Sequence, residues 1–220
     1  MRKISSKEAE VYLGGFGDPS AMPCPSFSIP REYCPRGKVL RTQPGTICSV
    51  CYGGRGNYFW PSVKAAQQRR AERLMFSSRF VEMFVIALKR MTFFRFFDCG
   101  DIPNLCCLER IMAVAKQCPW CRFWIPTREF NTVGAYVDAH GGFPENVNVR
   151  ISADYLDKMP ECVPNGCTFS TVVTLKNPDG FPGAHRCLPT FEDRVCEKCE
   201  EAGCRACWDR NVPHVCYKRH

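Results

Sequence analysis

The number of cysteines constrains this chain more than any other feature of its sequence. There are 17 cysteines among 220 residues. A chain of this length buries roughly 70% of its unfolded surface and needs no cross-links to fold. The odd count fits poorly with a closed disulfide framework, and residues 1–12 lack the apolar core of a secretory leader. We therefore expect a cytoplasmic protein with reduced thiols, in which many of the cysteines bind metal.

Composition and charge exclude several other classes. Hydrophobic residues make up 45% and aromatic residues 12% of the chain, which argues against a disordered, collagen-like or coiled-coil protein. No run approaches the ~20 apolar residues of a membrane span, so we expect no membrane contact. The net charge of +8 permits binding to nucleic acid. Basic side chains are concentrated in residues 61–90, which fit either a nucleic-acid contact or a solvated helix face.

The order of elements predicts an α/β fold in one compact unit. Residues 1–60 are expected to form a cysteine-rich irregular segment, 61–180 a β/α core and 181–220 a cysteine-rich metal-binding tail. Apolar spacing predicts helices over 61–74, 77–88, 105–115 and 131–139, and strands over 92–97, 121–125, 147–151 and 169–175. This alternation is typical of a parallel sheet. We expect either a partial (β/α) barrel or an open parallel sheet.

Polar residues follow the expected strands at their carboxyl ends, where α/β proteins bind ligands. The carboxyl ends of parallel strands share one rim, so these side chains should gather there. Asp101 and Asp154 each precede an expected helix, so helix capping explains them equally well. The rim set consists of Asp98, Asp101, Thr127, Arg128, Glu129, Ser152 and Asp154.

The first cysteine group has the pattern Cys34-x13-Cys48-x2-Cys51, with Cys24 ten residues upstream of Cys34. Three thiolates would leave one coordination position open, as reactive metal centres do. If Cys24 also binds, the site closes and becomes structural or electron-carrying. The spacing leaves both alternatives open.

The second cysteine group has the pattern Cys196-x2-Cys199-x4-Cys204-x2-Cys207, with Cys187 before it. Two C-x2-C turns deliver four thiolates, which suit tetrahedral zinc or an iron–sulfur cluster. More than one set of four satisfies the spacing. We expect this group to tie the tail to the core through a zinc ion or a second cluster.

Several ordered strings resemble the bacteriophage "gene product 88" family. The resemblance covers nearly all of residues 22–220. The matching strings are 25–30 (PSFSIP), 34–37 (CPRG), 48–52 (CSVCY), 56–58 (GNY), 100–101 (GD), 122–129 (RFWIPTRE), 149–153 (VRISA) and 204–209 (CRACWD). The resemblance implies a phage-encoded protein that acts in the host cytoplasm.

The family's cysteine loop and its β/α alternation also look like a distant radical-SAM layout. That resemblance implies a four-iron, four-sulfur (4Fe–4S) cluster on Cys34, Cys48 and Cys51. S-adenosylmethionine would bind its free iron. Gly100 and Asp101 would then lie in the turn that contacts the cosubstrate, while Arg128, Glu129, Arg150 and Ser152 would line the substrate side. The superfamily pattern is C-x3-C-x2-C, and here the first interval is thirteen residues.

These observations favour an iron–sulfur protein with a radical-SAM-like reaction on a polar substrate. Its catalytic residues would be Asp98, Asp101, Arg128 and Glu129, and its cofactor would be bound by Gly100, Asp101, Arg150 and Ser152. The alternative is a non-enzymatic zinc module that binds nucleic acid or a host protein through residues 61–90. A third alternative is a structural phage component stabilised by zinc.

Overall fold

A single open sheet of seven parallel strands organises the computed structural model, which describes residues 3–177, 179–191 and 198–219. The strand order is β1-β2-β3-β4-β5-β7-β6, and every pair is parallel. The prediction of an α/β open parallel sheet is confirmed, and the sheet does not close into a barrel. The strands are β1 (Ser26–Phe27), β2 (Phe93–Phe96), β3 (Arg122–Thr127), β4 (Val147–Ser152), β5 (Thr168–Val173), β6 (His185–Arg186) and β7 (His214–Lys218).

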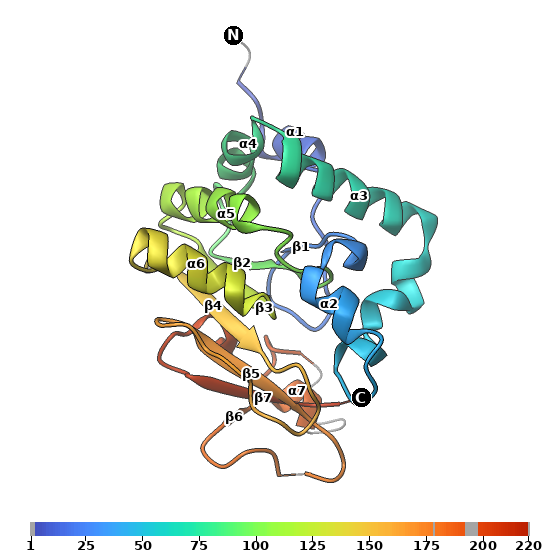
Figure 1. Ribbon diagram of the computed structural model, residues 1–220. Helices are drawn as coiled ribbons and strands as arrows, with labels where there is room; N and C mark the ends of the chain where they lie inside the picture. Colours follow the sequence, from blue (N-terminus) through green and yellow to red (C-terminus); the bar gives the residue numbers. More distant parts are fainter. Residues whose placement is uncertain (1–2, 178, 192–197, 220) are drawn as a thin grey trace.

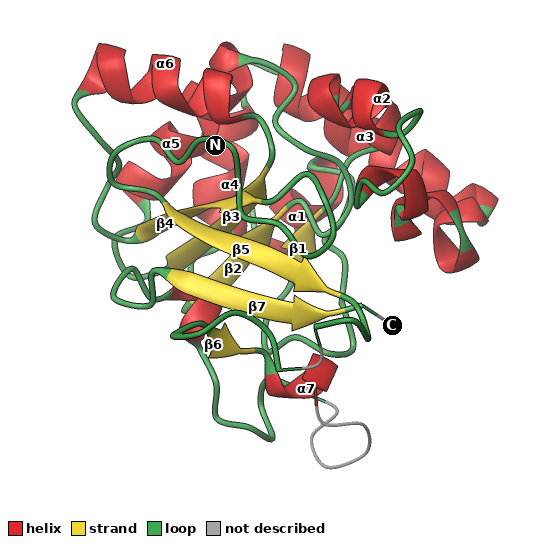
Figure 2. Cartoon of the chain, turned by 60° about the horizontal axis from the view of Figure 1, so that its bottom comes forward, coloured by secondary structure: helices red, strands yellow, loops and turns green. Residues whose placement is uncertain are grey.

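The helices lie mainly along one face of this sheet (Figures 1 and 2). Strands β1 to β4 are adjacent in chain order, and crossovers of one hand then place their helices on one side. The helices are α1 (Ser6–Tyr12), α2 (Pro35–Leu40), α3 (Pro61–Phe76), α4 (Phe80–Ala87), α5 (Leu105–Gln117), α6 (Phe130–His140) and the short α7 (Leu188–Phe191). Within the described ranges, no helix has the length and apolar character needed to cross a membrane.

The helix-covered face carries the main core. Alternate residues of β2, β3 and β4 point into it because successive side chains on a strand face opposite sides. Phe84 of α4 lies at its centre, with ring centroids 5.2 Å from Phe27, 5.5 Å from Phe94 and 5.3 Å from Phe96. This aromatic cluster joins β1 and β2 to α4, so the chain's first strand is held by the helices of the core.

The opposite face is covered at its amino half by the tail. Trp208 packs edge-on against Trp124 of β3 and donates from Nε1 to the carbonyl of Phe94, at 2.9 Å. Asn148 of β4 donates to the carbonyl of Cys207 at 2.9 Å. Arg150, fully buried, donates to the carbonyls of Ala206 and Val212, each at 3.0 Å. The tail thus fills this face next to β3 and β4 and leaves their carboxyl ends uncovered.

The expectation of an irregular segment over residues 1–60 was partly wrong. Helix α1 begins with a capping box in which Ser5 and Glu8 bond reciprocally, and α2 begins at Pro35. Both helices are too short for apolar periodicity to reveal them. The tail, which was expected to bind metal as part of one compact unit, also contributes β6 and β7 to the sheet. Strands from all three segments therefore share one sheet.

Arg150→Ala should lower the free energy of unfolding by at least about 3 kcal/mol, because it leaves several buried carbonyls without a donor. Arg122→Ala is the matched control, since Arg122 lies exposed on the neighbouring strand, and it should change stability by no more than about 0.5 kcal/mol. Urea denaturation measures both. Equal effects would mean that Arg150 does not anchor the tail.

Candidate functional site

A cavity of about 560 Å³ opens at the carboxyl ends of β2 to β5, on the sheet face away from the core helices. We call it the main cavity. The loop that carries the first cysteine group forms one wall, and the end of β7 forms another. It brings together most of the residues expected at the rim and in the first cysteine group. These are Cys34, Cys48, Cys51, Asp98, Gly100, Asp101, Thr127, Arg128 and Ser152.

The cysteine loop is held over this cavity by main-chain contacts with the end of β4. The amide of Ile47 donates to the carbonyl of Asp154 at 2.8 Å, and Thr46 forms a bridge with Tyr155. The buried Thr46 hydroxyl donates to the carbonyl of Leu40 at 2.6 Å. The 3-10 turn Cys48–Val50 then directs Cys48 and Cys51 toward the cavity.

Glycines leave room around the thiols. A Cβ on Gly37 would lie 3.7 Å from the sulfur of Cys34 and 3.9 Å from that of Cys48. A Cβ on Gly53 would lie 2.5 Å from the sulfur of Cys99 and 3.5 Å from that of Cys51. Cys99 therefore joins the first cysteine group. Cys99 belongs to no C-x2-C turn, and its position beside Asp98 is the sequence signal that could have placed it near the site.

Burial keeps the thiols of Cys34, Cys48 and Cys99 protonated in the absence of a bound cation. It raises the pKa of Cys99 to about 12 and also raises the pKa values of Cys34 and Cys48. The negative charge of Asp101 adds to the effect at Cys34. A thiolate is the form that binds metal, so metal binding here would release protons.

The two rim aspartates differ in their surroundings. Both oxygens of the buried Asp101 are engaged, by the Thr127 hydroxyl at 2.5 Å and by the amides of Ile102 (2.8 Å) and Arg128 (2.9 Å). Burial nevertheless raises its pKa. Asp101 thus braces the ends of β2 and β3.

Asp98 is nine-tenths buried and accepts a hydrogen bond from the Tyr58 hydroxyl at 3.0 Å through Oδ2. The hydroxyl of Tyr52 donates to its carbonyl. Its Oδ1 is buried and has no hydrogen-bond partner among the described residues. This oxygen is an acceptor that a polar ligand in the main cavity could satisfy.

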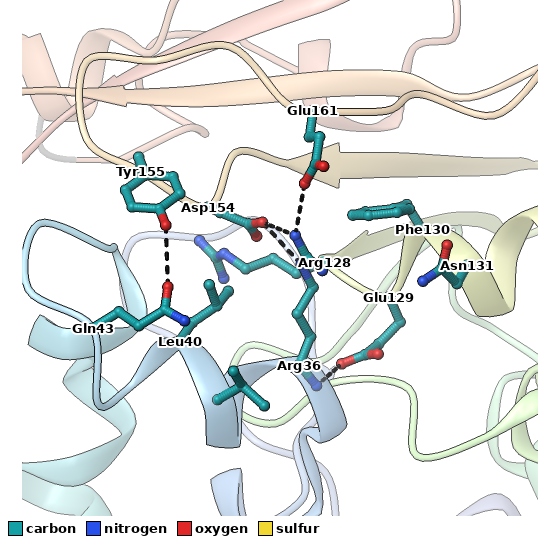
Figure 3. Close-up of a pocket in the computed structure, with 11 residues that line it drawn as sticks. Arg36, Leu40, Gln43, Arg128, Glu129, Phe130, Asn131, Asp154, Tyr155 and Glu161 are labelled. Atoms are coloured by element: carbon teal, nitrogen blue, oxygen red, sulfur yellow. Dashed lines mark hydrogen bonds and ion pairs between the residues drawn. The ribbon is translucent and has the colours of Figure 1, made fainter.

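Glu129 does not line the main cavity. It lies in a side cavity of about 360 Å³, shown in Figure 3, and accepts a hydrogen bond from the amide of Arg36 at 2.8 Å. Nε of Arg36 donates to Asp154 at 2.8 Å, and the guanidinium also pairs with the exposed Glu161. Burial raises the pKa of Glu129 to about 7, with a further contribution from the charge of Asp101. A carboxyl that titrates near neutrality is suited to acid–base chemistry.

Arg150 also lies away from the main cavity. Its guanidinium contacts the tail carbonyls described above and the carbonyl of Phe169, at 2.8 Å. It therefore anchors the tail instead of lining the substrate side that the resemblance implied. Ser152, two residues later on the same strand, does reach the cavity and accepts a hydrogen bond from Ser170 at 3.3 Å.

Cys24 lies with the tail cysteines and not with the loop. It is buried in the same apolar cluster as Cys207, with Cys187 and Cys204 packed against that cluster. The sulfur of Cys204 is 3.4 Å from Nε2 of His185. Burial raises the pKa values of Cys24 and Cys187 to about 12, and nearby Cys199 adds to both shifts. Cys196 falls outside the described residues.

The described residues form no ready site for a single metal ion. Within the part of the chain that the structure describes, no three His, Cys, Asp or Glu side chains are arranged so that they could hold a metal ion. The described cysteines of each group share a region without forming such a set.

Part of the basic surface expected over residues 61–90 is used internally. The guanidinium of Arg70 is buried and donates to the carbonyl of Gly15 and to the hydroxyl of Ser28. Arg73 donates to the carbonyl of Tyr12 at 3.0 Å. These arginines attach α3 to the N-terminal segment. Lys64 remains exposed at the start of the helix, near the cysteine loop.

Comparison with known proteins identifies one family. The model of the family described as Gene product 88 matches residues 2–216. No curated protein matches the chain, and no solved structure matches it.

The raised pKa of Glu129 predicts a pH dependence of stability. The folded state binds the proton more tightly than the unfolded state, so this group stabilises the fold fully below pH 4.5, and the contribution is lost as the pH rises to about 7. The loss is roughly 3 kcal/mol, at about 1.4 kcal/mol per pKa unit. Glu129→Gln should therefore flatten the fall in unfolding free energy over this range in urea denaturation.

Glu145→Gln is the control, because Glu145 is exposed at the far end of α6. An unchanged slope in Glu129→Gln would mean that Glu129 is ionised in the folded protein throughout this range.

Proposed function

The chain belongs to the gene product 88 family of phage proteins, and we propose that it is an iron–sulfur protein whose cluster is bound by Cys34, Cys48 and Cys51 over the main cavity. The strongest support is that residues from distant parts of the chain line one cavity. Thiols of a loop in the first 60 residues line one cavity with Asp98, Gly100 and Arg128 from the strand ends. Such a rim is where parallel sheets bind ligands.

A cluster requires ligating sulfurs that lie further apart than those of a single ion. A tetrahedral zinc site holds its sulfurs about 3.8 Å apart, as follows from a Zn–S bond of ~2.3 Å. Sulfurs that bind a cluster are kept further apart by the cluster itself. This agrees with thiols that line a common cavity without forming a single-ion site. Gly37 and Gly53 have no side chain, which allows the loop main chain to pack closely against these cysteines.

The remaining cavity residues would bind a cosubstrate such as S-adenosylmethionine. When bound, the cluster supplies an electron to such a cosubstrate. The unsatisfied Oδ1 of Asp98 would accept from an ammonium group. Arg128 lines the same wall and would face a carboxylate. Asp101 would act as a positioning residue because its oxygens already hold β2 and β3 together.

Cys48→Ala and Cys51→Ala should each remove most of the iron, the acid-labile sulfide and the broad absorption near ~400 nm from protein purified without oxygen. Cys106→Ala is the matched control, because Cys106 is exposed on α5 and should leave all three unchanged. Cys99→Ser tests whether three or four cysteines bind the cluster. If the full iron content is retained, Cys99 is not a ligand and one iron has an open position. Wild-type protein without iron or sulfide after reconstitution would contradict the proposal.

A second candidate function is zinc binding by the tail, with the protein acting as a zinc-stabilised binding module or structural component. It is favoured by the gathering of Cys24, Cys187, Cys204 and Cys207 in one apolar cluster, with His185 beside Cys204. The set joins the N-terminal segment to the tail. A metal ion bound to these cysteines would cross-link the N-terminal segment to the tail.

Cys204→Ser should lower the zinc content by about one ion per chain and lower the melting temperature, whereas Cys48→Ala should leave zinc unchanged. Elemental analysis and calorimetry on the same preparations measure both effects. Zinc that is lost equally in the two variants would refute separate sites, and zinc without iron in the wild type would favour the binding module over the iron–sulfur enzyme.

A further inference from the structure

We propose that the partner of the main cavity is a single-stranded nucleic acid, whose phosphates follow basic residues from the cavity to the start of α3 and whose bases stack on exposed aromatic rings of the cysteine loop. The binding surface is argued independently of the proposed cluster. Only the reaction rests on the proposed function, because a bound nucleotide would lie beside the loop thiols that hold the cluster.

The main cavity has an excess of positive charge. Its carboxylates are Asp98 and Asp101, and both oxygens of Asp101 are engaged. The basic residues that line it are Arg31, Arg41, Arg55, Arg95, Arg128, Lys218 and Arg219. A cavity of this charge attracts an anion.

Arg31 pairs with Glu32 at 3.3 Å, whereas other arginines of the cavity bond mainly to main-chain carbonyls. Arg128 donates to the carbonyl of Ala153, Arg55 to that of Val50 and Arg41 to that of Arg31. Arg95 donates to the carbonyl of Phe97 and stacks over Trp124, but its Nε is buried and has no partner among the described residues. Main-chain carbonyls orient the guanidinium groups without neutralising them, so they remain able to bind phosphate.

The basic path continues beyond the main cavity. An outer pocket of about 440 Å³ shares Arg31 and Gly53 with the main cavity. It extends to Phe59, in the turn before α3, and to Lys64, in α3 itself. The ammonium group of Lys64 lies 4.7 Å from the ring centroid of Phe59. Glu32 also lines the outer pocket and pairs with Arg31, which leaves Lys64 as the second cation of that pocket. A chain of phosphates fits two connected pockets that each carry cations, whereas a small anion would occupy only one.

Exposed aromatic side chains lie in the same segment: Tyr52 lines the main cavity, Phe59 lines the outer pocket and Trp60 follows Phe59 in the chain. Tyr52, Phe59 and Trp60 are 51%, 54% and 57% exposed, and all three lie in the short 3-10 turns and their flanks between Cys51 and α3. Exposed rings next to cations form the surface on which successive bases of a single strand stack. In a duplex the base faces are stacked on one another and are not available to these rings. The combination therefore favours a single strand over a duplex or a polyanion without bases.

The test is fluorescence anisotropy with a labelled 12-nucleotide single strand, DNA and RNA in parallel, on protein as purified. Trp60→Ala should weaken binding roughly tenfold. Arg55→Gln and Lys64→Gln should each weaken it several-fold and reduce the slope of log K against log salt by about 0.7. Phe76→Ala and Arg122→Gln are matched controls, since both residues are exposed away from the path, and they should leave affinity unchanged.

Four results would overturn the proposal: neither strand binds at low salt, a mononucleotide binds as tightly as the 12-mer, polyglutamate competes as well as unlabelled strand, or the control variants weaken binding as much as Trp60→Ala and Arg55→Gln. Iron and sulfide content of the same samples reports the proposed cluster separately. Loss of binding with an intact cluster therefore counts against the nucleic acid alone.

Discussion

The attachment of the cysteine loop to the carboxyl ends of the strands depends on Arg36. Its guanidinium pairs with Asp154, which is nine-tenths buried, and its amide donates to the equally buried Glu129. A carboxylate buried without a partner is strongly unfavourable, so Asp154 is stable in this position only while Arg36 is present. Arg36 is two residues from Cys34. The same ion pair that satisfies Asp154 thus fixes the loop thiols over the sheet.

The two faces of the sheet divide the tasks of the fold. One face is apolar and carries the helices, which gives β2, β3 and β4 a rigid backing. On the other face the tail occupies the amino half through Asn148, Arg150 and Trp208. The main cavity lies toward the strand carboxyl ends, in the space on this face that neither the tail nor the cysteine loop fills.

Regular elements of the core were predictable because their periodicity is strong. The expected helices and strands of residues 61–175 all have counterparts, with ends displaced by a few residues. The short α1, α2 and β1 have too few residues for a period to reveal them. Local signals are nevertheless present for both helices: Ser5 and Glu8 form the capping box of α1, and Pro35 is the first residue of α2.

Membership of the two cysteine groups was less predictable than their existence. Spacing along the chain places Cys24 near Cys34, but β1 lies between them and carries the chain across the sheet edge, so that Cys24 meets the tail. Cys99 joins the loop thiols because β2 ends beneath Gly53, a contact between distant segments. Arg150 was expected in the site because its strand ends at the rim. It lies on the part of that face that the tail covers, so its guanidinium bonds to tail carbonyls.

Charge links the proposed cluster to the proposed substrate. Burial keeps Cys34, Cys48 and Cys99 neutral in the free protein, so the surrounding arginines face few anions and the main cavity is positive. Binding of iron would convert thiols to thiolates and reduce this excess close to the loop. Arg55 lines the main cavity together with Cys51, whereas Lys64 lies in the outer pocket and not among the residues that line the cavity of the thiols. The cations beside the thiols would then stabilise the cluster, while those away from the thiols, such as Lys64, would remain available for phosphates.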